Sequence, residues 1–229
     1  MIAALYGCAL GSSARRGWIF VAAALLAATA AAKAETLSFL PTKDNTLYQD
    51  AAGSLSNGQG AYLFSGRTKD GFIRRGLMAF NLSAIPAEAR VTAVTLTLYS
   101  SKSSKPPLPV EISLRKVTRN WGEGASNAGD PGGAGAPAQT GDATWRHTFY
   151  STAMWTNPGG DFVGTSSATT AVDTEDRAYN WSGNGMIADV QSWVANPASN
   201  FGWALVANET AKETAQRFNS GENSFNRRD

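Results

Sequence analysis

Histidine and cysteine, two residue types that often act in catalysis, occur once each in this chain of 229 residues. A zinc site made of several histidines is excluded, and so is a proton relay between two histidines. A Ser–His–Asp triad would have to use His147, but the sequence has no Gly-x-Ser-x-Gly motif. It also lacks the Glu-x-Asp-x-x-Glu spacing that would place two carboxylates on one strand for glycoside hydrolysis. We therefore predict that the protein is not an enzyme.

Three acidic residues stand close together in a polar stretch: Asp173, Glu175 and Asp176. The neighbouring Thr174 and Arg177 favour a solvated loop. Carboxylate oxygens are also ligands that Ca²⁺ prefers, so the same three residues are candidate calcium ligands. No other cofactor is expected.

Aromatic and basic side chains offer chemistry for binding. Sugar rings stack on aromatic faces, and arginines pair with the carboxylates of acidic polysaccharides. Trp193 and Trp203 stand in apolar patterns and are expected in the core. The candidate ligand-binding residues are Trp145, Trp155, Trp181, Tyr150, Arg67, Arg74 and Arg75. The alternative for the aromatic residues is packing within loops, and for the arginines an ordinary charged edge.

The N-terminal segment has the features of a cleavable signal peptide. Two arginines at positions 15 and 16 precede a short apolar stretch, and Ala32-Lys33-Ala34 provides an A-x-A cleavage site. The stretch is short and rich in alanine for a membrane span. We predict that residues 1–34 are removed and that the protein is secreted or held at the cell surface, meeting the membrane only during export. A retained anchor is the alternative, and the paired arginines would also suit export of a folded chain.

Removal of this leader changes the charge and cysteine content. It takes away three basic residues and no acid, so 17 basic and 18 acidic residues remain and the formal charge becomes −1. Beyond residues 67–75 there is no dense basic cluster, and a nucleic-acid partner is not expected. The one cysteine, Cys8, lies in the leader. The exported chain therefore cannot form disulfides, and its stability must come from core burial.

Alternating apolar residues predict strands along the exported chain. The clearest example is Val91–Ser100, in which valine and leucine at positions 94, 96 and 98 share one face. Val110–Val117 alternates in the same way, and Ile73–Asn81 suits a buried strand. Further strands are predicted at Thr36–Leu40, Ala61–Ser65, Thr144–Tyr150, Ser166–Val172, Phe201–Val206 and Ala215–Phe218.

One short helix is predicted near residues 185–195. Met186, Val190, Trp193 and Val194 follow helical spacing. Asn184 can cap the helix, and Asn196-Pro197 ends it. The segment 121–141 has seven glycines and two prolines and is predicted to be a long loop. Together these elements predict a single all-β domain at 35–229, an antiparallel β-sandwich of two packed sheets.

Several segments, taken in order, resemble the DNRLRE-domain family. The most specific is the block around Phe80–Leu98, where a strand, a Ser-x-Ile-Pro turn and an alternating strand follow one another. The other matching segments are Asp44–Tyr48, Trp121–Gly124, Asp142–Trp145, Asp189–Trp193 and Phe201–Trp203. The resemblance covers nearly all of the chain after the leader.

This resemblance implies an extracellular β-sandwich of jelly-roll type, similar to carbohydrate-binding modules. The implied function is a non-catalytic module that binds polysaccharide or a cell-surface glycan. A structural or adhesive surface module without a sugar ligand is the first alternative, and a polysaccharide-degrading enzyme is the second. Family members also close with an Asn-Arg-Pro-like turn and a last strand. Here the match ends at Asn226-Arg227, so we expect a domain that lacks its closing strand and is truncated at its C-terminus.

Overall fold

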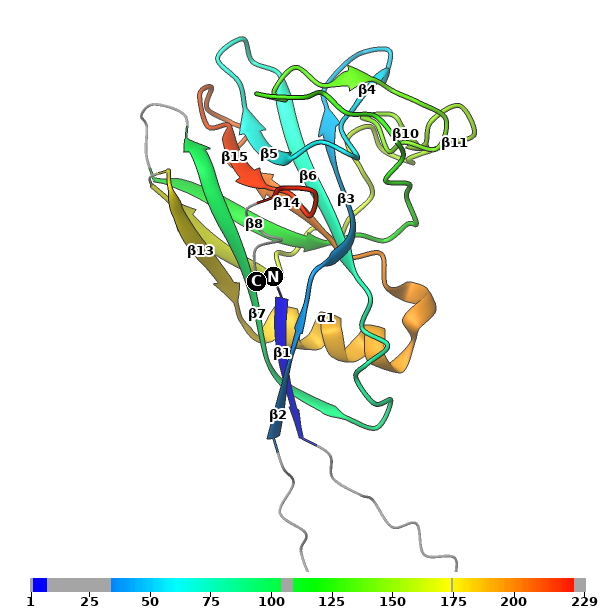
Figure 1. The fold of residues 1–229 in the computed structure, drawn as a ribbon, viewed down its shortest axis with the longest axis vertical. Helices are drawn as coiled ribbons and strands as arrows, with labels where there is room; N and C mark the ends of the chain where they lie inside the picture. The colour runs from blue at the N-terminus through cyan, green and yellow to red at the C-terminus, as the bar shows by residue number, and fades with distance from the viewer. Residues whose placement is uncertain (1, 8–33, 104–108, 174, 225–229) are drawn as a thin grey trace, which may run out of the picture.

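The computed structural model describes residues 2–7, 34–103, 109–173 and 175–224 (Figure 1). Its regular structure is mainly antiparallel β-sheet with one α-helix among the described residues. The prediction of an antiparallel, mostly β protein with a single helix is therefore confirmed.

Most of the strands belong to one continuous sheet. Its strands are β1 (Ile2–Gly7), β2 (Ala34–Phe39), β3 (Pro41–Tyr48), β5 (Tyr62–Arg67), β6 (Ile73–Phe80), β7 (Arg90–Ser103), β8 (Val110–Lys116), β12 (Ala168–Val172), β13 (Arg177–Ser182), β14 (Trp203–Ala207) and β15 (Gln216–Asn219). Their order is β12-β8-β14-β6-β5-β15-β7-β1-β2, with β3 also pairing with β6 and β13 with β7. Two small ribbons stand apart: β4 (Leu55–Ser56) with β9 (Ala136–Pro137), and β10 (His147–Phe149) with β11 (Ala153–Met154).

The main sheet curls into a nearly closed, barrel-like shape, which corrects the prediction of a sandwich of two packed sheets (Figure 1). The two halves are joined through β5. Its last two residues pair with β6, and Tyr62–Ser65 pair with β15. One strand thus carries the hydrogen-bonded ladder from one half of the sheet to the other.

Gly66 stands where β5 passes between these two partner strands. Its φ is +117°, a region in which a side chain is strained. A Cβ at this position would lie 2.3 Å from the carbonyl oxygen of Thr214. Glycine therefore permits both the bend and the close approach of the neighbouring backbone. Apolar alternation within single strands does not reveal such a corner, and for this reason the sequence predicted two sheets.

The alternation predicted for β7 and β8 is confirmed. Val94, Leu96 and Leu98 are buried, as are the inward residues of β8. They belong to a large apolar cluster that also includes Trp203 and the buried face of the helix. A second apolar cluster contains Trp145, together with residues of β3 and β6, and supports the loops at the other end of the molecule.

Helix α1 (Asn184–Ala195) confirms the predicted helix, and its buried residues are the four that were expected from helical spacing. The cap differs from the prediction. Gly183 is the residue at the N-cap, and the first turn has no side-chain cap. The helix start lies against the β12 entry, where a Cβ at Gly185 would be 2.5 Å from the carbonyl oxygen of Ser167. The helix ends at Asn196 before the 3₁₀ turn η1 (Pro197–Ser199), as predicted.

Strand β13 was missing from the sequence prediction, which placed Arg177 in a solvated loop and assigned no element to the five residues after it. Its outward residues are polar or small, whereas Tyr179 and Trp181 are buried. The strand pairs with β7 along Thr95–Ser100. Because only two of its six side chains point inward, its apolar signal is short.

The glycine-rich segment 121–141 contains only the two-residue strand β9, in line with the predicted loop. Polar contacts order it. The carboxylate of Asp142 accepts hydrogen bonds from the backbone N–H groups of Ala125 and Gln139, at 2.8 and 2.7 Å. The segment lies with β4, β10 and β11 at the upper end of the molecule in Figure 1.

Most of the predicted leader, residues 8–33, lies outside the described residues. Residues 2–7 are described and form β1, which lies between β2 and β7 and pairs with both. Asn226 and Arg227 also lie outside the described residues, and β15, the last described strand, pairs with β5 and β7. In the part of the chain that the structure describes, no helix is long and apolar enough to cross a membrane.

Candidate functional site

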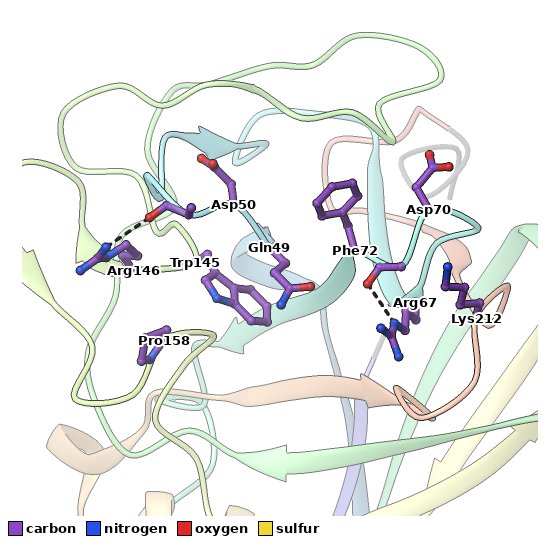
Figure 2. A pocket seen from close by; sticks show the side chains of 11 residues that line it. Gln49, Asp50, Arg67, Asp70, Phe72, Trp145, Arg146, Pro158 and Lys212 are labelled. Atoms are coloured by element: carbon purple, nitrogen blue, oxygen red, sulfur yellow. Dashed lines mark hydrogen bonds between the residues drawn. The ribbon is translucent and has the colours of Figure 1, made fainter.

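A cleft of about 610 Å³ opens among the loops at one end of the barrel. Its walls come from five parts of the chain: the segment after β3, the β5–β6 turn, the loop before β10, the loop after β11, and the β14–β15 loop. Figure 2 shows Arg67 and Lys212 on one side of this cleft and Arg146 on the other, with Phe72 and Trp145 between them.

Phe72 is the most accessible aromatic side chain of the cleft, with 52% of its surface exposed. It stands at the end of the β5–β6 turn, where its carbonyl oxygen accepts a hydrogen bond from the N–H of Thr68 at 2.9 Å. Gly71, just before it, has a φ of +97°, which favours glycine and allows the tight reversal. The turn therefore holds a large apolar ring at the mouth of an open cleft.

Three cationic side chains also line the cleft, with Arg67 and Lys212 on the Phe72 side and Arg146 on the Trp145 side (Figure 2). Arg67 donates from Nε to the carbonyl oxygen of Gly71 at 2.9 Å, and Arg146 donates from Nη1 to the carbonyl oxygen of Ala51 at 3.2 Å. Lys212 is exposed on the β14–β15 loop. Among the described residues, none of the three forms an ion pair with a carboxylate. Backbone carbonyl groups thus orient Arg67 and Arg146, and no described carboxylate neutralises the charge of these arginines or of Lys212.

Two carboxylates also line the cleft. Asp50 accepts hydrogen bonds from the backbone N–H and the hydroxyl of Ser54, at 2.7 and 2.8 Å, and from the N–H of Ala52 at 3.2 Å. These bonds, chiefly that from the Ser54 N–H, hold the pKa of Asp50 below its ordinary value although partial burial opposes them. Asp50 is therefore ionised, and its carboxylate oxygens accept hydrogen bonds from residues of its own loop. Asp70 is exposed at the opposite side (Figure 2).

Trp145 reaches the cleft with only a small part of its ring, because 8% of its surface is exposed. The rest packs in the second apolar cluster. Gly159 lies against the ring, where a Cβ would come within 2.8 Å of it, and donates its N–H to the Trp145 carbonyl oxygen at 2.6 Å. Trp145 thus forms a firm wall with little free face for stacking.

Arg74 and Arg75 serve packing and lie outside the cleft lining. Arg74 is buried, with its guanidinium 4.7 Å from the ring centroid of Tyr48. Arg75 forms a bidentate pair with Glu209 at 2.7 and 2.8 Å and donates to the carbonyl oxygen of Gly159 at 2.8 Å. Both guanidinium groups are therefore occupied by contacts within the protein.

The remaining aromatic candidates also lie away from the cleft lining. Trp155 is buried and donates from Nε1 to the carbonyl oxygen of Thr144 at 2.9 Å. Trp181 lies in the main core and donates to the carbonyl oxygen of Ile112 at 2.8 Å. Tyr150 is half-buried and packs edge-on against His147, with ring centroids 5.1 Å apart. Of the seven predicted ligand-binding residues, the cleft brings together Arg67 and Trp145.

Two of the three acidic candidates for calcium accept hydrogen bonds from neighbouring residues. Asp173 accepts a hydrogen bond from the Tyr179 hydroxyl at 2.5 Å, and Glu175 accepts one from the N–H of Ser103 at 3.1 Å. Asp176 is exposed. In the ranges that the structure describes, no group of three His, Cys, Asp or Glu side chains has an arrangement that could hold a metal ion.

Sequence reasoning missed Phe72, Arg146 and Lys212. Each follows or flanks a turn signal, such as Asp70-Gly71 before Phe72. Such a signal predicts that each residue lies in a loop. Whether the three loops come close to one another depends on how the sheet curls. The predicted set favoured tryptophans, whose large apolar rings are buried here.

No family model matches the chain, and no curated protein matches it. The resemblance to the DNRLRE-domain family therefore depends only on the residues of the motifs given above and on their order along the chain.

Proposed function

We propose that this protein is a non-catalytic module that binds polysaccharide in the cleft around Phe72. The observation that carries the proposal is an exposed aromatic ring beside cations that no described carboxylate neutralises. The C–H face of a sugar can stack on such a ring, while Arg146 and Lys212 pair with carboxylates on neighbouring sugars. Acidic polysaccharides fit this combination better than neutral ones.

The carboxylate of Asp50 supports binding rather than hydrolysis. A glycosidase needs one carboxylic acid whose pKa is raised, so that it can protonate the leaving oxygen. The pKa of Asp50 is lowered, and its oxygens accept hydrogen bonds from its own loop. Asp50 is therefore a poor proton donor. Its role is to order the loop after β3 through these hydrogen bonds.

We further propose that the curled sheet is a variant of the jelly roll and that the protein is exported to the cell surface or beyond. The block from β6 through the Ser-x-Ile-Pro turn to β7, which resembles the DNRLRE-domain family, supports the fold assignment. The predicted leader supports export. A module of this kind would act by attaching itself, or a larger protein that contains it, to a glycan surface.

The second candidate function is a structural or adhesive surface module without a sugar ligand. The burial of Trp145 and the hydrogen bonds of Arg67 to loop carbonyl groups favour this alternative, because both residues already stabilise the loops. In this case Phe72 and Lys212 would contribute nothing to retention on a glycan.

Affinity electrophoresis distinguishes the two functions. The full chain would be run through native gels that contain either an acidic or a neutral polysaccharide. We expect retardation by the acidic gel, reduced in Phe72→Ala and Lys212→Ala. Matched controls are Val163→Ala, an exposed apolar residue outside the cleft, and Lys102→Ala, an exposed lysine on β7. If the acidic gel does not retard the wild type, the structural alternative is favoured, and if it retards all variants like the wild type, the glycan binds outside this cleft.

A further inference from the structure

Lys43 and Asn120 meet across 77 residues of chain at the start of β3. The ammonium nitrogen of Lys43 donates to Oδ1 of Asn120 at 3.0 Å and to the carbonyl oxygen of Trp121 at 2.6 Å. The same nitrogen lies 4.3 Å from the ring centroid of Trp121. The lysine is half-buried, whereas Asn120 is exposed. An amine and a primary amide are thus held in contact with one side open to water.

The amide oxygen of Asn120 has a second donor. The backbone N–H of Trp121 points to the same Oδ1 at 2.9 Å. Donors aimed at a carbonyl oxygen draw electron density from its carbon and stabilise the oxyanion that forms when a nucleophile adds. The local backbone therefore polarises the amide at the position that the lysine nitrogen already contacts.

A carboxyl group lies beside this pair. Oε1 of Glu123 accepts the N–H of Asp44, the residue next to Lys43, at 2.8 Å, and Oε2 accepts from Gln59 at 3.3 Å. Burial lowers the pKa of Lys43 to about 8, against the opposing charge of Glu123. Burial also raises the pKa of Glu123, with a further contribution from Glu222. The neutral form of the Lys43 amine is therefore populated at mildly alkaline pH, and the carboxyl group of Glu123 can accept and donate a proton beside it.

We propose that Lys43 and Asn120 form an intramolecular isopeptide bond. The lysine nitrogen, once deprotonated, adds to Cγ of Asn120, and the oxyanion is held by the N–H of Trp121. Glu123 takes a proton from the attacking nitrogen and delivers it to Nδ2. The Cγ–Nδ2 bond then breaks and ammonia leaves through the exposed side of Asn120. One amine and one primary amide become one secondary amide and one ammonia, and no oxidant or reductant takes part.

The bond would tie the start of β3 to the loop after β8. These segments are distant in sequence, so the link closes a long loop in the unfolded chain and reduces its conformational entropy. It would also hold the Lys43 nitrogen beside the ring of Trp121. The carboxyl groups that face this region are Glu123, Asp44 and Glu222, and the rate of bond formation should rise as Lys43 loses its proton.

Mass spectrometry of the full chain tests the proposal. The chain would be incubated folded at pH 9, denatured and weighed intact. We expect a mass lower by one ammonia and, after trypsin, no cleavage at Lys43 and a branched peptide that joins Lys43 to Asn120. A succinimide also loses ammonia, for example at Asn184-Gly185, but it does not join two peptides. Recovery of the unbranched peptides, with trypsin cutting normally after Lys43, would overturn the proposal.

Three variants and one control variant locate the chemistry. Lys43→Arg and Asn120→Ala should each abolish the branched peptide, and Asn127→Ala, an exposed asparagine in the same loop, should leave it unchanged. Glu123→Gln should slow its formation by about a hundredfold, because proton transfer is lost. An unchanged rate in Glu123→Gln would exclude the role assigned to Glu123. A branched peptide at full yield in Asn120→Ala would contradict the proposed bond.

Discussion

The guanidinium of Arg75 lies 5.0 Å from the ring centroid of Trp145, and the carboxylate of Glu209 holds it there with two hydrogen bonds of 2.7 and 2.8 Å. This relationship connects β6, the loop before β10 and the loop after β14. Trp145 forms one wall of the cleft, so Arg75 acts as a support beneath that wall. Arg75 was predicted from the sequence to contact a ligand, but in the structure it packs against Trp145 and pairs with Glu209.

Arg75→Ala should lower the free energy of unfolding by about 2 kcal/mol, because it leaves the partly buried carboxylate of Glu209 without its partner. Urea titration followed by tryptophan fluorescence would measure the change. The control is Arg177→Ala, whose ion pair with Asp173 is exposed and longer, and which should cost less than about 0.5 kcal/mol. Equal losses in the two variants would show that the Arg75 pair has no special role.

Gly66→Ala should destabilise the barrel by about 3 kcal/mol. The new side chain would adopt a strained φ of +117° and approach the carbonyl oxygen of Thr214. Gly164→Ala is the matched control, because a Cβ there would meet no atom within 4 Å. Thermal unfolding of both variants measures the difference. If Gly66→Ala unfolds at the wild-type temperature, the corner at β5 is not the constraint described above.

The buried carboxyl of Asp44 predicts a pH dependence of stability. Burial, followed by the nearby charge of Glu222, raises the pKa of Asp44 well above its ordinary value of 3.8. The folded state therefore binds a proton more tightly than the unfolded state does. The stabilisation is fully present below about pH 4 and is lost as the pH rises through the raised pKa.

Asp44→Asn should remove this dependence and make the protein more stable near neutral pH, since the amide oxygen can still accept the N–H of Gly221, as Asp44 does at 2.7 Å. Urea titrations between pH 4 and pH 8 would show a flatter profile than the wild type. Glu88→Gln, at an exposed position, should leave the profile unchanged. A wild-type slope retained in Asp44→Asn would place the responsible group elsewhere.

Export should produce a chain that begins at Glu35, since the predicted cleavage follows Ala34. The N-terminal peptide of secreted material, identified by mass spectrometry, tests this directly. Ala34→Pro, which disrupts the A-x-A site, should block processing, and Ala51→Pro, beyond the site, should not. Secreted protein that retains Met1 would contradict the leader prediction.

The sequence predicted those parts of the fold that have their own local pattern. The alternation of β7 and the spacing of Met186, Val190 and Trp193 in α1 are independent of partners, and both are confirmed. Strand β13 was missed because polar residues surround Tyr179 and Trp181. The corner at Gly66 arises from contact with a distant segment, and no local pattern encodes it.

The candidate site was less predictable for the same reason. Phe72, Arg146 and Lys212 belong to three separate loops, and their proximity depends on how the sheet curls. Local composition also cannot tell a tryptophan that seals a loop, such as Trp155, from one that faces solvent. Only Arg67 and Trp145 were identified in advance.

The most direct test of the proposed function is the affinity of the cleft for an acidic polysaccharide, compared between wild type and Phe72→Ala. Gels containing polygalacturonate or dextran would be run at low and high salt, with Val163→Ala as the control. We predict that polygalacturonate retards the wild type at low salt, that salt weakens the effect, and that Phe72→Ala loses most of it while Val163→Ala does not. Equal mobility of the wild type in both gels at low salt, or equal retardation of Phe72→Ala, would contradict glycan binding at this cleft.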